Sequence, residues 1–263
     1  MIFAPHLLHA TDGFEAEYFA QIARLEASGH FWLRGRALVI GWALTRYFGT
    51  AKNYLEIGCG TGHLLAEALA ASPTLQVSGS EVLEEGLKYA AANVPAATLY
   101  QMDARQIPFE QEFEVIGAYD VLEHIEEDHA VLAEMFRAVT PGGGIILTVP
   151  QHPFLWGPGD DYARHKRRYT RSELVAKVRD AGFEVIRTTS CLSLLFPALL
   201  ISRLRDRRAT GTFDPLAEFR LGPLLNRMLA LVSATERVMI KGGLSFPFGG
   251  SLLLVARRPQ RQA

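Results

Sequence analysis

Hydrophobic positions follow two different periods along this chain, one before and one after residue 50. In the first part, Phe14, Tyr18 and Ile22 recur at helical spacing, and the run 31–48 contains no proline. This pattern predicts helices over residues 14–48, because apolar residues three or four apart share one helix face. Beyond residue 50, short apolar runs alternate with helical ones. The predicted strands are 54–57, 75–80, 97–102, 114–118 and 145–149, and the predicted helices are 62–71, 84–93 and 123–139, with a turn at 141–144.

This alternation is typical of a parallel sheet covered by helices on both faces. We therefore expect a Rossmann-like, doubly wound α/β fold that binds its ligand at the carboxyl ends of the strands. The pattern changes beyond residue 150, where 150–170 predicts a long loop. A capping box at Thr170 and Glu173 then predicts a helix to about Asp180. Later predicted elements are a strand at 183–188, a helical insertion at 193–242 and a last strand at 251–256.

Composition narrows the class of protein. The chain has 263 residues, 49% hydrophobic and 21% charged, which suits one globular domain with a sizeable core. A net charge of −1 argues against a nucleic-acid-binding surface. Cys59 and Cys191 form neither a disulfide framework nor a zinc-ligand spacing. The start of the chain lacks the features of a signal peptide, and no apolar run reaches the ~20 residues that span a bilayer, so we expect a cytoplasmic protein.

Three glycines follow the first predicted strand at alternate positions. Gly58, Gly60 and Gly62 stand between an apolar run that contains Glu56 and a helix-forming run. Glycine suits a turn that needs positive φ or a close approach of backbone to a ligand. The triplet alone is weak evidence, because any tight strand-to-helix turn can use it.

Acidic residues follow the next strands in order. Glu81 ends the second strand, where a carboxylate can accept both hydroxyls of a ribose. Asp103 follows the third strand and can accept from an exocyclic amine. Asp120 follows the fourth. Each has a simpler explanation: Glu81 as a solvated strand end, Asp103 as a turn residue, and Asp120 with Glu123 as a helix-capping box. Their shared order after successive strands favours a nucleoside site.

The ordered motifs resemble those of class I S-adenosylmethionine-dependent methyltransferases, and most closely the ubiquinone-biosynthesis-type branch. The motifs are Leu55-Glu-Ile-Gly-Cys-Gly-Thr-Gly62, Glu81, Asp103, Phe113-Glu-Val-Ile with Asp120-Val-Leu-Glu-His-Ile125, and Pro141-Gly-Gly-Gly144. The resemblance covers roughly residues 50–190. It implies a seven-stranded sheet whose last strand, 251–256, is antiparallel. It also implies one methyltransferase domain over 1–263, with an N-terminal helical cap (1–49), a cofactor-binding core (50–190), a helical insertion (191–245) and a closing strand and tail (246–263).

The resemblance also implies the cofactor, S-adenosylmethionine, with S-adenosylhomocysteine as its product. This cofactor has no pyrophosphate to place at a helix terminus, so the G-x-G-x-x-G pattern of dinucleotide enzymes is not required. The glycine turn would pass beneath the methionine portion, Glu81 would hold the ribose, and Asp103 with Ala104 would border the adenine. Tyr119 and Asp120 would lie near the methionine or the acceptor. The implied cofactor-binding residues are Glu56, Gly58, Cys59, Gly60, Gly62, Glu81, Asp103, Ala104, Tyr119 and Asp120.

Histidines beside the fourth and fifth strands are the candidates for catalysis. Methyl transfer mostly needs alignment, and a base only when the acceptor must lose a proton early. His124 lies in a family motif, His152 follows the fifth strand, and His165 lies in the basic segment 162–171. Each could equally serve packing. No pair of histidines shows HxxxH or HxH spacing, so we expect no metal.

We expect residues 150–242 to determine which methyl acceptor the protein binds. The basic segment is either a solvated loop or a lid that recognises an anionic group. The insertion at 193–242 carries apolar stripes beside arginines, which suits either peripheral membrane contact or a helical cap against the domain or a second subunit. We expect a small-molecule acceptor that is apolar or lipid-like with an anionic group, and a monomer or homodimer. Alternatives are a sugar or protein side chain as acceptor, or a non-catalytic adenosylmethionine-binding protein; nucleic acid is disfavoured.

Overall fold

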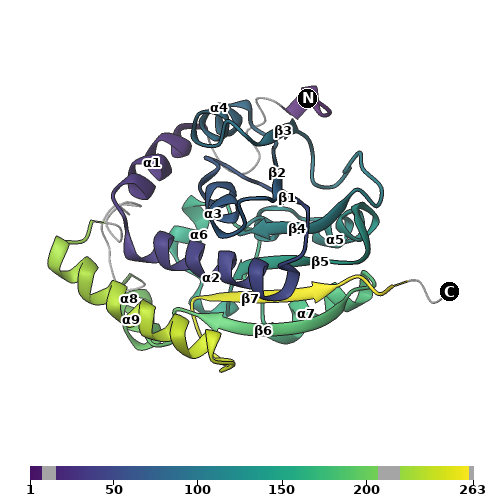
Figure 1. The fold of residues 1–263 in the computed structure, drawn as a ribbon. Coiled ribbons are helices and arrows are strands. Elements are labelled where there is room, and N and C mark those ends of the chain that lie inside the picture. Colours follow the sequence, from purple (N-terminus) through teal and green to yellow (C-terminus); the bar gives the residue numbers. More distant parts are fainter. Residues whose placement is uncertain (8–15, 207–219, 261–263) are drawn as a thin grey trace.

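Seven strands form one twisted sheet with helices on both faces (Figure 1). The structure is a computed structural model, and it describes residues 1–7, 16–206 and 220–260. The strands are β1 (Asn53–Ile57), β2 (Gln76–Glu81), β3 (Thr98–Gln101), β4 (Phe113–Tyr119), β5 (Val139–Pro150), β6 (Glu184–Cys191) and β7 (Ser251–Arg257). The α-helices are α1 (Ala16–Ala27), α2 (Phe31–Phe48), α3 (His63–Ala71), α4 (Glu84–Asn93), α5 (Asp128–Ala138), α6 (Pro158–Tyr162), α7 (Arg171–Asp180), α8 (Phe196–Asp206) and α9 (Pro223–Lys241).

The strand order is β3-β2-β1-β4-β5-β7-β6, which confirms the doubly wound fold expected from the sequence. Strands β1 to β5 pair in parallel, whereas β7 lies antiparallel between β5 and β6. The antiparallel last strand is therefore also confirmed. Strand order reverses between β1 and β4, so the carboxyl ends of these two strands are where such a sheet binds its ligand.

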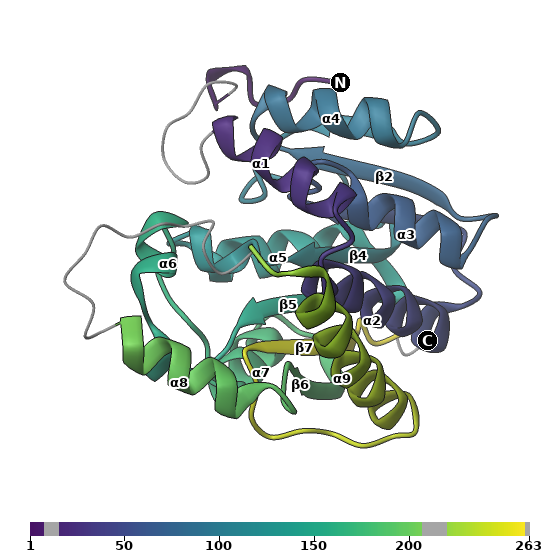
Figure 2. The ribbon, with the colours of Figure 1, turned by 90° about the vertical axis from the view of Figure 1, so that its left-hand side faces the viewer.

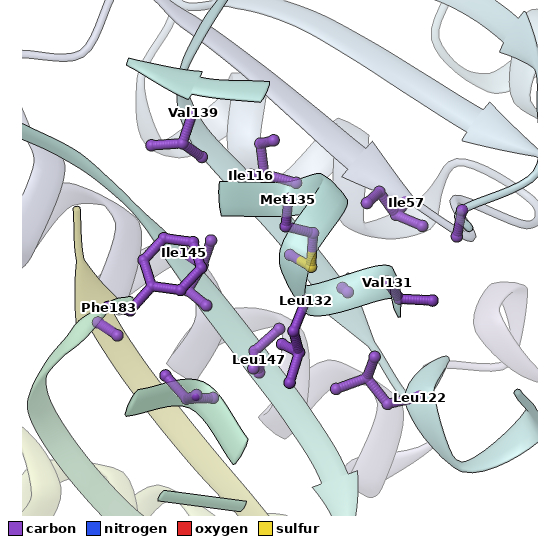
Figure 3. Packing of buried hydrophobic residues seen from close by; sticks show 14 of the residues in the cluster. Ile57, Ile116, Leu122, Val131, Leu132, Met135, Val139, Ile145, Leu147 and Phe183 are labelled. Carbon is purple, nitrogen blue, oxygen red and sulfur yellow. The ribbon is translucent and has the colours of Figure 1, made fainter. Parts of the chain in front are cut away.

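Buried apolar side chains form one cluster on each face of the sheet. Residues of α5 and α7 pack on one face, where Figure 3 shows Leu132 and Met135 over the strands. Residues of α2, α3 and α4 pack on the other face. Successive residues of β5, Ile146 and Leu147, belong to opposite clusters. Because both faces are covered, the central strands are rich in apolar residues along their whole length instead of alternating apolar and polar ones.

Between residues 120 and 150, one predicted element is confirmed with a later start and another is wrong. The helix expected at 123–139 is confirmed over Asp128–Ala138 (α5), and a short 3-10 helix, Leu122–His124, precedes it. The turn expected at 141–144 lies inside β5. A Cβ at Gly143 would meet the carbonyl oxygen of Glu114, and one at Gly144 that of Ala256. These glycines therefore let β5 lie close to its neighbours. The strand bulges at this segment, because Val139 and Gly144 pair with Phe113 and Val115 of β4, and Gly142 has a φ of +83°.

The loop expected at 150–170 also contains regular structure, a 3-10 helix (Pro153–Leu155) and α6. Two neighbouring predictions are more accurate. Thr170 Oγ1 accepts a hydrogen bond from the Glu173 backbone N–H at 3.2 Å, which confirms the cap of α7. The helical region expected at 14–48 contains two helices, α1 and α2. Residues 14 and 15 lie outside the described part of the chain.

The insertion contributes α8 and α9, which lie on the same side of the molecule (Figures 1 and 2). Helix α9 packs along α2, and the Asn226 side chain accepts a hydrogen bond from the Phe31 backbone N–H at 2.9 Å. Residues 207–219 of the predicted insertion lie outside the described residues. In the described part of the chain, none of the helices has the length and apolar character that a membrane crossing needs.

Candidate functional site

The glycine turn follows β1 and has left-handed backbone at all three glycines. Gly58, Gly60 and Gly62 have φ values of +67°, +51° and +80°. A Cβ at Gly58 would lie 2.5 Å from Val121 Cγ2, and one at Gly62 would lie 3.0 Å from Ala90 Cα. The glycines therefore let the turn pack closely against Val121 and against α4. The thiol of Cys59 instead points into the core, where burial raises its pKa.

The Glu81 carboxylate lies directly beside this turn. It accepts backbone N–H groups of Gly60, Val82 and Leu83 at 3.2, 2.8 and 3.3 Å. Burial raises the pKa of Glu81, and the three N–H groups oppose that rise. Phe19 of α1 covers this region, since a Cβ at Gly86 would lie 2.9 Å from both Glu81 Cγ and Phe19 Cζ. A half-buried carboxylate with remaining acceptor capacity suits the hydroxyls of a ribose.

Asp103, after β3, already has a partner within the protein. Arg105 donates to its carboxylate through Nε at 3.1 and 3.0 Å and through Nη2 at 2.8 Å. Burial alone would raise the pKa of Asp103, but the Arg105 hydrogen bonds lower it overall. Its neighbour Ala104 is buried in the core. Asp103 therefore lies at the expected strand end with its charge neutralised by Arg105.

Tyr119 points into the buried cluster between the sheet and α2. Its hydroxyl lies 3.1 Å from that of Tyr54, which donates to Glu56 Oε2 at 3.4 Å. Glu56 is only 2% exposed, and burial raises its pKa to about 8 although the positive charge of Arg36 opposes that rise. Glu56 and Tyr119 thus form a buried polar network beneath the strand ends.

Asp120 meets an arginine that the sequence analysis did not identify. Arg36 Nη1, from α2, lies 2.9 Å from Asp120 Oδ2, and the Thr148 hydroxyl donates to Asp120 Oδ1 at 3.1 Å. Asp120 has a φ of +55°, a conformation that few non-glycine residues adopt. The capping box considered for Asp120 and Glu123 is not formed. Arg36 is one of three arginines on α2 and gave no sequence signal of its own, because only the fold brings this helix over β4.

His124 and His165 come together with two buried carboxylates. Their ring centroids lie 4.8 Å apart, and His165 Nδ1 is 2.8 Å from Asp160 Oδ1. His165 Nε2 lies 3.9 Å from Glu123 Oε1. Glu123 is fully buried, and neither carboxylate oxygen has a hydrogen-bond partner among the described residues. Burial, followed by the nearby Asp120 charge, holds the pKa of Glu123 well above its usual range.

These side chains also bear on the expectation that there is no metal. Glu123, His124 and His165 each place a ligand atom within 4.8 Å of the others, so they are a set of described residues that could hold a metal ion. The spacing rule could not find them, because His165 lies far from Glu123 in the sequence. Burial and the neighbouring His165 lower the pKa of His124 to about 4.

His152 lies in a different environment from the other two candidate histidines. Its ring contacts are with Phe154, Phe196 and Phe248, at centroid distances of 5.0, 5.8 and 5.6 Å. Its backbone has a φ of +64°, and burial lowers its pKa. The structure therefore brings His124 and His165 together and places His152 in an aromatic cluster.

The basic segment uses several of its arginines inside the protein. Arg168 Nε donates to the buried Asp160 at 2.8 Å. Arg167 Nη1 lies 3.0 Å from Asp128 Oδ2, and Arg171 donates to the backbone carbonyl of Phe246. These contacts favour a loop anchored to the protein, in part by Asp160, over an anion-recognising lid.

Comparisons with known proteins agree with this geometry. The family model described as a methyltransferase domain matches residues 32–188. A ubiquinone biosynthesis O-methyltransferase from Pseudomonas paraeruginosa is 31% identical over 202 residues, which cover 63% of this chain and 83% of that protein.

Solved structures show the same fold at lower identity. Phosphoethanolamine N-methyltransferase 2 of Haemonchus contortus, in complex with S-adenosylmethionine, has a TM-score of 0.57 at 20% identity, covering 86% of this chain and 52% of that one. The cyclase SpnF has a TM-score of 0.56 at 20% identity, covering 84% and 80%. At this identity the two structures support the fold alone. The family model and the ordered site residues go further: the chain belongs to the methyltransferase domain family and is a class I S-adenosylmethionine-dependent methyltransferase.

Proposed function

We propose that the protein transfers the methyl group of S-adenosylmethionine to a small-molecule acceptor that is apolar or lipid-like. The observation that carries this proposal is the glycine turn with Glu81 hydrogen-bonded to its Gly60 N–H. Membership of the family establishes the class of reaction, methyl transfer, whereas the nature of the acceptor is our proposal. The Pseudomonas relative is named as an O-methyltransferase of ubiquinone biosynthesis, and this name guides the choice of compounds to test.

The residues present fit the cofactor. Glycine at position 58 lets the turn pack tightly, since a Cβ there would lie 2.5 Å from Val121 Cγ2. Arg36 Nη1 is bound to Asp120, but its buried Nε has no hydrogen-bond partner among the described residues, so we propose that Nε donates to the carboxylate of the cofactor's methionine portion. When bound, S-adenosylmethionine supplies a methyl group on a sulfonium. The residues proposed to hold or border it are Glu56, Gly58, Cys59, Gly60, Gly62, Glu81, Asp103, Ala104, Tyr119 and Asp120, with Arg36 added.

The structure changes how several of these residues would act. Cys59, Ala104 and Tyr119 are buried, so we propose that they act through their backbone or by shaping the site. The anionic group expected on the acceptor loses support, because Arg167, Arg168 and Arg171 bind protein acceptors. We therefore still propose an apolar acceptor. We also propose that residues 1–263 form one methyltransferase domain.

For a hydroxyl acceptor, we propose His165 as the proton-accepting residue ahead of His124 and His152. Asp160 fixes the ring through Nδ1, which leaves Nε2 on the side of Glu123. Replacing His165 by Gln is expected to lower turnover about a hundredfold or more while cofactor affinity stays unchanged. His129→Gln, at an exposed position on α5, is the control. Unchanged turnover would remove His165 from this role. If a chelator abolished the activity and Mg²⁺ restored it, Glu123, His124 and His165 would instead be assigned as metal ligands.

Calorimetric titration with S-adenosylmethionine and with NAD tests the donor. We expect binding of the first and none of the second, and the reverse would contradict the proposal. Incubation with S-adenosylmethionine carrying a deuterated methyl group, together with panels of apolar phenols, sugars and peptides, then tests the acceptor by mass spectrometry. Label in a sugar or peptide would favour those alternatives. Cofactor binding without transfer to any panel would favour a non-catalytic binding protein.

A further inference from the structure

Exposed large apolar side chains are concentrated in one part of the described chain. Of sixteen such residues, eleven lie between positions 194 and 248. Soluble proteins rarely leave large apolar patches uncovered unless the patch meets a partner or a membrane. The eleven residues, named here the insertion surface, are Leu194, Ile201, Leu204, Leu224, Leu225, Met228, Leu231, Val238, Met239, Leu244 and Phe248.

Helix α9 supplies the most exposed stripe of this surface. Leu224, Met228, Leu231 and Val238 are 75%, 57%, 65% and 69% exposed, and their spacing places them on one helix face. The opposite side packs along α2 and buries Ile240. The stripe is therefore the face of α9 that the described residues leave uncovered.

Helix α8 adds a second exposed stripe on the same side of the molecule. Ile201 and Leu204 are 52% and 49% exposed and lie three residues apart. Figures 1 and 2 show α8 and α9 on the same side of the molecule. Phe248 joins the surface to the start of α8, because its ring centroid lies 6.2 Å from that of Phe196. Two helices and a loop thus expose apolar residues in one region.

The charge of this segment is opposite to that of the rest of the chain. Residues 193–248 contain eight Lys or Arg and four Asp or Glu, a net charge of +4 in a chain of net −1. Arg205, Arg227 and Lys241 are exposed beside the apolar stripes. Glu236 does not offset them at the surface, because its carboxylate is buried and accepts the Leu192 and Leu194 N–H groups at 2.7 and 2.8 Å.

We propose that the insertion surface docks the protein on an anionic lipid bilayer. Apolar side chains flanked by exposed cations are the combination that lies in a membrane interface, where apolar burial and attraction to anionic lipids add. A second copy of the chain fits less well, because a two-fold dimer through this surface would bring two net positive segments together. The contact is peripheral, with the stripes entering the headgroup region. It does not depend on the identity of the acceptor or on catalysis.

Vesicle flotation of the full chain tests this docking. Vesicles containing phosphatidylglycerol are expected to carry the protein, those of phosphatidylcholine alone much less, and added salt should weaken the binding. The double variant Met228→Glu, Leu231→Glu should lower the partition coefficient at least about tenfold, because two apolar contacts are lost. Arg227→Ala should lower it roughly fivefold, as expected for one cation at an anionic surface.

Ile186→Glu is the matched control, because Ile186 is exposed on β6 outside the insertion surface. Its partition should equal that of the wild type, and thermal melts should show that all variants fold. Absence of flotation with phosphatidylglycerol vesicles would overturn the proposal, as would equal flotation of the double variant and the wild type. A dimer seen by light scattering that Leu231→Glu abolishes would instead assign this surface to a second copy.

Discussion

Two regions of the molecule differ in how far their apolar side chains are buried. One is the sheet with its glycine turn, and the other is the insertion with α8 and α9. In the sheet, Leu132 of α5 and Ile146 of β5 are fully buried, and the polar groups at the strand ends have partners such as Gly60 N–H and Arg36. In the insertion, Leu224 and Val238 are largely exposed. The difference teaches that apolar residues have two uses in one chain. Those of the sheet stabilise the fold, whereas the exposed ones of the insertion surface are expected to contribute little to stability.

The largest expected effect separates these two uses directly. Leu132→Ala removes a fully buried side chain from the cluster between α5 and the sheet. It should lower the free energy of unfolding by about 2–5 kcal/mol, because it leaves a cavity. Leu231→Ala, at a 65% exposed position, should change it by less than about 0.5 kcal/mol. Urea unfolding measures both. A large loss for Leu231→Ala would mean that the surface of α9 is covered within the fold.

A pH-dependent effect is expected from Glu56, which lies beneath the strand ends. Burial raises its folded-state pKa to about 8, so the stability it contributes is full below its unfolded pKa and is lost as pH rises through about 8. Glu56→Gln should therefore become more stable relative to wild type between pH 5 and 8.5, by a few kcal/mol, since each pKa unit is worth about 1.4 kcal/mol. Urea unfolding across this range measures the difference. A difference that does not change with pH would contradict the raised pKa.

A smaller effect is expected at the glycine turn. Gly58→Ala places a Cβ on left-handed backbone and within 2.5 Å of Val121. It should lower the free energy of unfolding by about 1–2 kcal/mol and weaken cofactor binding. Gly222→Ala is the control, because Gly222 has an ordinary φ and open space around it. Equal melting temperatures for the two variants would show that the turn tolerates a side chain.

The succession of strands along the chain and the residues at their ends could be predicted, because both depend on the local pattern of apolar residues and glycines. The apolar run before Gly58 and the position of Glu81 at the end of β2 are visible in the sequence, and the structure places Glu81 beside the turn. The Pro141–Gly144 segment misled the prediction, because glycine signals a turn locally but here allows strands to approach closely. Whether a strand continues through such residues depends on its neighbours.

Groups that meet only through the tertiary fold could not be predicted. Arg36 reaches Asp120 from a helix more than eighty residues earlier in the sequence. Asp160 holds His165, which then lies near Glu123. No sequence spacing relates these residues, because their contact depends on how α2 and the segment after β5 pack over the strand ends.

The central claim is that the glycine turn and Glu81 together hold S-adenosylmethionine. Calorimetric affinity for S-adenosylmethionine, compared between wild type and Glu81→Ala, tests it most directly. Glu84→Ala, in the first turn of α4, is the control for loss of a nearby carboxylate. The account predicts that Glu81→Ala weakens binding by about 1–3 kcal/mol and that Glu84→Ala leaves it unchanged, because only Glu81 would lose a buried hydrogen bond to the ribose. Equal affinities for wild type and Glu81→Ala would contradict it.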